Sequence, residues 1–308
     1  MWNLQSVPGL LETMGLPFTY NASAVGTEAN NSEMRFKMPP RDSLWLKFRL
    51  YIPQNFEHRM DIHLTMNNPQ NLGWSLGDKV RAADGLSTGI IHAFDDTGVW
   101  IKYPNKEIYK DGVWVGQIVN VTRGNSLAST QHALFHHNNK LLAIWADGYS
   151  WKGLGPTIVW EYWSGEAGAN NTFQESVLAV HYSPGNYVVA NEHVQHTNFI
   201  SPSDRGHYID VMAHVQFSSG QGTNDGVIQT WLKKEGQHNF VKIHELSHAN
   251  LDKKIRGANS ESSYVGSPTD LQPWQNGYFM GASNSGFDQQ TTFYLTSLEY
   301  FDALPAEL

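Results

Sequence analysis

Alternation of apolar and polar residues is the main signal along this chain. Residues 207–219 read HYIDVMAHVQFSS, and the residues from Tyr208 to Gln216 alternate between two sides. One side carries His207, Ile209, Val211, Ala213, Val215 and Phe217, and the other carries Tyr208, Asp210, Met212, His214 and Gln216. A period of two is typical of a β-strand with one buried face. Residues 43–52, SLWLKFRLYI, alternate in the same way, so we predict a strand in each segment.

Strand patterns separated by turns continue along most of the chain, and no convincing helical periodicity interrupts them. A sheet with one apolar face must bury that face against another layer, so the pattern predicts an all-β, two-sheet sandwich. Residues 34–72 and 124–308 are assigned to this sandwich, and residues 1–33 to an extended N-terminal arm. Residues 73–123 contain short strands with tight Asp-Gly and Thr-Gly turns. They are either a small inserted β-barrel or hairpin module, or a long hairpin excursion of the same sheet.

Composition removes several classes of function. The net charge of −8 argues against a nucleic-acid partner, which would need a basic face for phosphates. The chain has no cysteine, which excludes disulfides and cysteine-ligated metals. No stretch approaches the roughly 18 apolar residues of a membrane span, and the N-terminal residues lack the pattern of a signal peptide. We therefore expect no membrane partner and no export through a signal peptide.

Four segments carry a family resemblance. They are LWLKFRLYIPQNFE at 44–57, NNKLLAIWADGYS at 138–150, the pair HYIDVMAHVQF and DGVIQTWLKKEG within 207–236, and NGYFMGASNSGFDQQTTFYLTSLEYF at 276–301. Together they resemble the jelly-roll polysaccharide lyases and their laminin G- and concanavalin A-like relatives. The resemblance covers roughly two thirds of the chain and implies a jelly-roll fold more firmly than an activity.

The chain departs from the lyase pattern at two strands. These lyases often carry a Gln-Ile-His strand and a Tyr-Phe-Lys-x-Gly strand. The nearest segments here are Lys242-Ile243-His244 and Tyr278-Phe279-Met280-Gly281, which lack the Gln and the Lys. The segment GDKVRAADGLSTGIIHAF at 77–94 is similar to a short β-module met in structural proteins of tailed bacteriophages. Beside a jelly roll, this module favours a virion protein.

The polar side of residues 207–219 is the first candidate site. In a lyase, His214 or Tyr208 would take a proton from a uronic acid, and Arg49 or Lys47 would neutralise its carboxylate. The alternative is a solvated face without turnover. A glycan-binding face would use polar groups and aromatic rings, and the candidates are Trp45, Arg49, Trp145, Tyr149, Trp160, Tyr162, Asp210, His214 and Gln216.

Metal and cofactor sites receive little support from the sequence. The histidines lack zinc-site spacing, and no phosphate loop or dinucleotide fingerprint occurs. Asp288, with Asn284 and Gly286, could offer oxygen ligands to Ca²⁺, although turn chemistry explains the same residues. Glu161 and Glu166 are a further pair of carboxylates, but they lie five residues apart across a predicted turn. We expect no metal and no cofactor.

Three functional hypotheses follow. The first is a non-enzymatic bacteriophage virion protein, in the capsid decoration or the tail, with a glycan-binding type of jelly roll. It would be assembled in the host cytoplasm and would contact other virion proteins or copies of itself, with a polysaccharide as a further partner. The alternative is a polysaccharide lyase or depolymerase that cleaves an acidic glycan by β-elimination. The third is a lectin-like module outside any virion.

Overall fold

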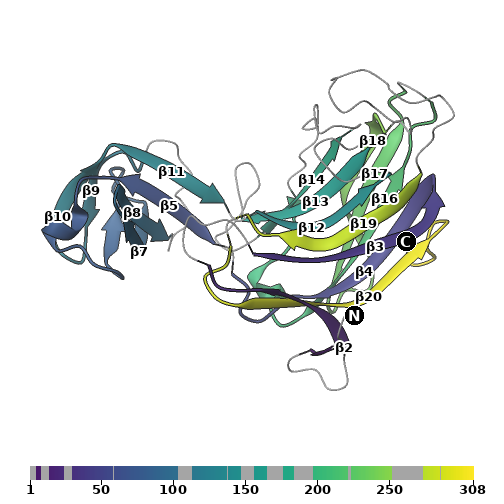
Figure 1. Ribbon diagram of the computed structural model, residues 1–308, viewed down its shortest axis with the longest axis horizontal. Coiled ribbons are helices and arrows are strands. Elements are labelled where there is room, and N and C mark those ends of the chain that lie inside the picture. Colours follow the sequence, from purple (N-terminus) through teal and green to yellow (C-terminus); the bar gives the residue numbers. More distant parts are fainter. Residues whose placement is uncertain are drawn as a thin grey trace.

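The protein is almost entirely β-structure, as its computed structural model shows (Figure 1). This confirms the all-β prediction. Within the residues that the structure describes, no helix is long and apolar enough to cross a membrane. The described residues are 5–7, 14–23, 30–57, 59–102, 113–136, 138–146, 156–164, 176–183, 197–220, 223–251, 273–284 and 286–308.

One layer of the sandwich is a seven-stranded sheet. In spatial order its strands are β1 (Gln5–Ser6), β2 (Met14–Tyr20), β20 (Thr291–Phe301), β4 (Ser43–Tyr51), β16 (Tyr208–Gln216), β17 (Gly226–Lys234) and β18 (Val241–Ala249). Strands β4 and β16 confirm the two predicted strands, and they pair with each other antiparallel along their whole length. A short 3-10 helix, η2 (Pro202–Asp204), precedes β16.

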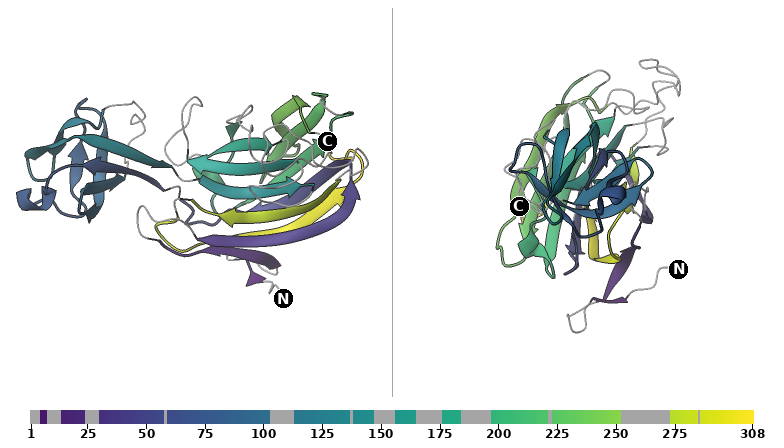
Figure 2. Two further views of the ribbon diagram at one scale, coloured as in Figure 1. Left: turned by 45° about the horizontal axis from the view of Figure 1, so that its top comes forward. Right: turned by 90° about the vertical axis from the view of Figure 1, so that its left-hand side faces the viewer.

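The other layer is a six-stranded sheet. In spatial order its strands are β15 (Thr197–Asn198), β14 (Ser176–Ser183), β13 (Thr157–Ser164), β12 (Asn138–Trp145), β19 (Trp274–Ala282) and β3 (Asn31–Arg41). The two layers pack face to face into a jelly-roll sandwich (Figure 2).

Residues 1–33, expected to form an N-terminal arm, contribute to both layers through β2 and the start of β3. Strand β2 pairs with β20, because its alternate residues Leu16, Phe18 and Tyr20 are apolar and reach the core.

The main core fills the space between the two sheets. Leu46, Phe48 and Leu50 of β4 enter it from the seven-stranded sheet. Trp160 enters it from β13, and its Nε1 donates a hydrogen bond to Oγ1 of Thr230 on β17 at 2.8 Å. A buried indole needs such a partner for its N–H group, so this bond helps to fix the two layers against each other.

A third sheet forms a separate module beside the sandwich (Figures 1 and 2). Its core contains Trp74, Trp114, Ile62, Leu64 and neighbouring apolar residues, none of which belongs to the core of the sandwich. A short 3-10 helix, η1 (Pro69–Leu72), lies within it. In spatial order its strands are β10 (Asn125–Ser129), β9 (Gly116–Asn120), β6 (Lys79–Arg81), β7 (Thr88–Asp95), β8 (Gly98–Lys102), β5 (Met60–Thr65) and β11 (Gln131–His136).

The module is larger than the segment 73–123, because β5 precedes that segment and β11 follows it. These two strands pair antiparallel at one edge of the sheet, with β5 leading out from the sandwich and β11 leading back to it (Figure 1). Among the described residues no pairing joins β10 to β11, so the strands form an open sheet rather than a closed barrel. Having its own sheet and core, this part is not a hairpin excursion of a sandwich sheet.

A buried guanidinium links the module to the sandwich. The Arg59 side chain is 3% exposed, and its Nε lies 3.2 Å from Oδ2 of Asp61 on β5 and 3.0 Å from Oδ1 of Asp288, which follows β19. Its Nη2 also donates a hydrogen bond to the backbone oxygen of Ser23 at 2.6 Å. One side chain thus contacts both parts of the molecule, and a buried charge with several partners resists separation from them.

Asp288, considered above as an oxygen ligand for Ca²⁺, has protein partners at this position. Its carboxylate is an ion-pair partner of both Arg59 and Lys102. Burial alone would raise the pKa of Asp288, but the hydrogen bond and charge of Lys102, with the charge of Arg59, lower it below its usual value. Two protein cations therefore balance the charge of this carboxylate. Across the described residues, no group of three or more His, Cys, Asp or Glu is arranged to hold a metal ion.

Candidate functional site

The structure brings several of the predicted site residues together on the outward face of the seven-stranded sheet. In the pairing of β4 with β16, His214 stands opposite Trp45 and Asp210 stands opposite Arg49. The alternate residues of β16, from Ile209 to Val215, belong to the main core, as predicted. Gln216 is exposed at the end of β16.

His214 is surrounded by its neighbours on this face. Its ring stacks on the ring of Trp45, with centroids 4.0 Å apart and an interplanar angle of 9°, and the ring of Trp231 lies 5.3 Å from that of Trp45. Its Nε2 lies 3.0 Å from Oγ of Ser43, and its Nδ1 lies 3.1 Å from Oε1 of Gln229. The residue is 7% exposed, and both ring nitrogens are engaged, by Ser43 and Gln229, so neither is available to accept a proton from a substrate. This argues against His214 as the base of a lyase.

The charged residues of the same face are also paired. Asp210 lies 3.5 Å from Nε of Arg49 and 3.4 Å from Nζ of Lys233. The guanidinium of Arg49 lies over the ring of Tyr208, 4.6 Å from its centroid. Nζ of Lys47 donates hydrogen bonds to both carboxylate oxygens of Glu307. Arg49 and Lys47, expected to neutralise a uronate, therefore each lie beside a carboxylate of the protein.

The predicted aromatic residues lie in different places. Trp160 and Tyr162 point into the main core and are at most 1% exposed, which corrects the expectation that they stack on sugar rings. Tyr149 lies outside the described residues. Trp145 is on the outward face of the six-stranded sheet, where its ring packs against Tyr278 at a centroid distance of 5.9 Å.

That outward face also carries a buried carboxylate, Glu161 of β13. Because Trp160 and Tyr162 on either side of it point into the core, Glu161 points outward. Nδ2 of Asn138 and Nε1 of Trp163 donate hydrogen bonds to its Oε2 at 3.0 Å and 2.7 Å. Glu161 is nevertheless only 4% exposed. An ionised carboxylate at this depth requires partners of this kind.

Two titratable groups from the neighbouring strands complete the cluster. Nζ of Lys140, opposite Glu161 in the pairing of β12 with β13, contacts Oε1 of Glu161. Nε2 of His181 on β14 lies 3.4 Å from Oε2. Burial lowers the pKa of Lys140 to about 8 from its usual 10.5. An amine with this pKa exchanges protons near neutral pH, which an ordinary surface lysine does not.

The backbone next to Lys140 is unusual. Met280 of β19 has a φ of 57°, a value that is uncommon for a residue other than glycine. The next residue is Gly281, where an added Cβ would stand 3.1 Å from Cβ of Lys140 and 3.2 Å from the ring of Tyr278. Close packing thus brings Tyr278 and Lys140 against the same glycine. Backbone strain of this kind is found preferentially at functional sites.

The cross-strand neighbours of Tyr278 lie on the same outward face of the six-stranded sheet. Arg35 of β3 stands opposite Tyr278 on one side, and Ala143 of β12 stands opposite it on the other. Val159 follows Ala143 in the same row, and His181 follows Val159. An arginine, a phenol and an imidazole therefore share one row across the sheet, with small apolar side chains between them. Lys140 and Glu161 belong to the adjoining row.

Sequence reasoning missed the centre of this cluster. Glu161 was noticed only as one of two carboxylates, and Lys140 was not singled out. The available signal was a single charged residue in an otherwise apolar and aromatic strand, TIVWEYWS at 157–164.

Comparisons with known proteins give similarities to solved structures only. No family model and no curated protein matches the chain. The alginate lyase Aly36B is 11% identical, with 94% of this chain and 80% of that chain covered and a TM-score of 0.43. The alginate lyase vAL-1 from Chlorella virus is 8% identical, with 97% and 92% covered and a TM-score of 0.38. A legume lectin-like domain from Entamoeba histolytica is 9% identical, with 98% and 88% covered and a TM-score of 0.36. At these values the similarity carries no information about the reaction or ligand of this chain.

Proposed function

We propose that the protein binds an acidic polysaccharide on the outward face of the six-stranded sheet and cleaves it by β-elimination. The observation that carries this proposal is the contact of the Lys140 amine with the buried Glu161, and burial also lowers the pKa of Lys140 to about 8. Tyr278 and Trp145 pack against each other on the same face, where they are 2% and 6% exposed.

The chemistry assigns a role to each group. The neutral amine of Lys140 takes the proton from the ring carbon next to the uronate carboxylate. The electrons of that C–H bond form a double bond to the neighbouring carbon, and the glycosidic C–O bond on that carbon breaks. Tyr278 donates a proton to the departing oxygen. Glu161 stabilises the ammonium that forms on Lys140, because a carboxylate in contact with a cation favours the charged form.

A cation is needed to hold the uronate carboxylate and to stabilise the charge that develops on it. Arg35 stands opposite Tyr278 in the sheet, and its side chain is 65% exposed. Its ion pair with Glu33 is at the surface, where such pairs contribute little stability and exchange readily for another anion. Arg35 is therefore the residue that we assign to the substrate carboxylate.

The test is the appearance of unsaturated uronate ends, followed by their ultraviolet absorbance. Purified protein is incubated with alginate, polygalacturonate, hyaluronan and heparin. Cleavage of at least one polymer is expected, and Lys140→Ala should lower the rate by about 100-fold or more, the usual worth of a general base. Lys242→Ala is the matched control, since Lys242 lies on the other sheet over the ring of Trp231. Cleavage of none of the four, or full activity of Lys140→Ala, would contradict the proposal.

A second candidate function is a non-catalytic, glycan-binding bacteriophage virion protein. The module favours it, because a compact unit with its own core, fixed beside the sandwich through Arg59, suits attachment to other virion proteins. Quantitative mass spectrometry of purified particles should then find the protein in fixed proportion to the major capsid protein. A protein found only in the soluble fraction of the lysate would exclude this function.

A further inference from the structure

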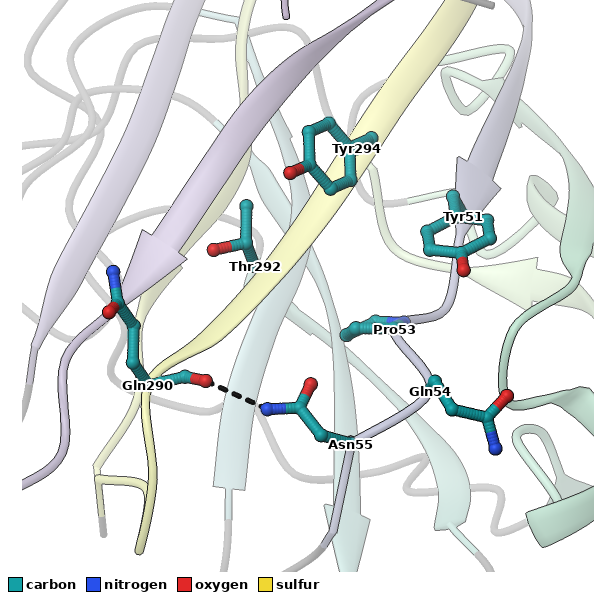
Figure 3. A pocket seen from close by; sticks show the side chains of 7 residues that line it. All are labelled: Tyr51, Pro53, Gln54, Asn55, Gln290, Thr292 and Tyr294. Carbon is teal, nitrogen blue, oxygen red and sulfur yellow. Dashed lines mark hydrogen bonds between the residues drawn. The ribbon is translucent and has the colours of Figure 1, made fainter. Parts of the chain in front are cut away.

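A cavity lies at the end of the seven-stranded sheet, where β4 finishes and β20 begins (Figure 3). It is on the layer opposite the one that carries Lys140. Its volume is about 430 Å³, within the range of small-molecule sites and enough for one or two sugar rings. The lining residues are Tyr51, Pro53, Gln54, Asn55, Gln290, Thr292 and Tyr294.

The lining is polar and aromatic but carries no charge. Tyr51 and Tyr294 stand beside each other with centroids 6.1 Å apart and an interplanar angle of 65°. The side-chain amides of Gln54, Asn55 and Gln290 offer both donors and acceptors, which match sugar hydroxyls. A carboxylate in this cavity would lose its water without meeting a cation, which is costly. The cavity therefore suits a neutral polyhydroxylated ligand.

Hydrogen bonds fix the two segments that form the cavity. Nδ2 of Asn55 donates to the backbone oxygen of Gln290 at 2.9 Å, as the dashed line in Figure 3 marks. Nε2 of Gln289 donates to the backbone oxygen of Asn55, also at 2.9 Å. The hydroxyl of Thr292 is 3.0 Å from that of Thr19 on β2. A cavity fixed in this way loses little conformational entropy when a ligand binds.

We propose that this cavity is a binding site for a neutral saccharide, one or two hexose rings in length. The rings of Tyr51 and Tyr294 contact the C–H face of the sugar, and the amides of Asn55 and Gln290 exchange hydrogen bonds with its hydroxyls. The site is separate from the one around Lys140, so it does not rest on the lyase proposal. In a chain that cleaves or displays a polysaccharide, it adds a second point of attachment with its own specificity.

The experiment is a titration with defined oligosaccharides, followed by saturation-transfer NMR and calorimetry. The probes are cellotetraose, maltotetraose, mannotetraose and, as the acidic counterpart, a tetrasaccharide of galacturonate. The wild type should bind at least one neutral probe and should not prefer the acidic one. Gln290→Ala should weaken binding about tenfold, as expected for the loss of one hydrogen bond to a ligand. Thr292→Trp should abolish binding, because the indole fills the cavity.

Two control variants make the result specific. Gln70→Ala removes an exposed glutamine of the module and should leave binding unchanged. Lys140→Ala should also leave neutral-sugar binding unchanged, even if it abolishes cleavage. The proposal is overturned if no neutral probe binds, if Thr292→Trp still binds, or if the galacturonate probe binds more tightly. It is equally overturned if only Lys140→Ala abolishes binding, because the sugar then occupies the other face.

Discussion

The outward faces of the two sandwich sheets use similar residues in different ways. On the seven-stranded sheet, a histidine stacks on a tryptophan and the charged residues form pairs at or near the surface, such as Arg49 with Asp210. On the six-stranded sheet, a histidine, a lysine, an asparagine and a tryptophan all converge on Glu161, which is almost completely buried. The outward face of the seven-stranded sheet therefore holds several separate contacts, whereas on the six-stranded sheet the contacts share one residue, Glu161.

This difference matters for both stability and chemistry. Exposed pairs can break and re-form with water at little cost. A buried charge cannot, so its partners are held in place and their pKa values respond to burial. Residue types alone would have favoured the face of β16, which carries Tyr, Asp, His and Gln. Burial and convergence instead favour the face of β13, where the lysine has the pKa of a proton-transfer group.

The largest effect should come from removing Glu161 from the face of the six-stranded sheet. Glu161→Ala leaves the amine of Lys140 and the N–H groups of Asn138 and Trp163 partly buried and without this acceptor. We expect a loss of about 3 to 5 kcal/mol in the free energy of unfolding, the usual result of breaking a buried ion pair from one side. Urea denaturation followed by tryptophan fluorescence measures it.

The matched control for this variant is Glu245→Ala on the seven-stranded sheet. Glu245 accepts hydrogen bonds from Gln229 and Lys242, but its side chain is 52% exposed. We expect this loss to be much smaller than that of Glu161→Ala, because exposed pairs contribute little stability. Equal losses from the two substitutions would mean that the two faces do not differ in the way described.

The next effect is the pH dependence of cleavage. With a pKa of about 8, Lys140 is mostly protonated at neutral pH and gains its base form as the pH rises. The kcat/KM value should therefore increase about tenfold per pH unit up to pH 8 and then level off. Lys140→Arg, which keeps the charge but cannot lose its proton, should remain inactive across the range. A rate that is flat between pH 6 and pH 9 would contradict the role of Lys140 as the base.

The sequence was sufficient to predict the sandwich and much of its core. Alternation decides which residues of a strand share a side, and the apolar side of β16 is buried as predicted. Alternation could not predict whether an individual aromatic residue lies in the core or at the surface. Trp160 and Tyr162 lie in the core, and the polar group of Trp160 is satisfied by Thr230, which is far away in the sequence. No local pattern reveals such a partner.

The cluster around Glu161 could not be predicted for a related reason. Lys140, Glu161 and His181 belong to three different strands, and only the pairing register brings them together. Register depends on turn geometry and on the packing of whole sheets. The site of β16 was easier to see because its residues lie in one short segment, but nearness in the sequence does not make a functional site.

The smallest effect separates the two faces most directly. Replacing His214 by alanine removes the stacking on Trp45 and the hydrogen bonds to Ser43 and Gln229, which should cost about 1 to 2 kcal/mol of stability. Burial lowers the pKa of His214, partly opposed by the Gln229 hydrogen bond. On lowering the pH, His214 therefore takes up a proton at a higher pH in the unfolded chain than in the folded protein. The stability that neutral, buried His214 contributes is lost as the pH falls below about 6.5. In the variant, the decrease in stability between pH 7 and pH 5 should be shallower, as urea denaturation at each pH would show.

The glycan cleavage of His214→Ala should stay within about twofold of the wild type, since the cluster around Glu161 is on the other sheet. A tenfold loss of cleavage would instead place the reaction on the face of β16.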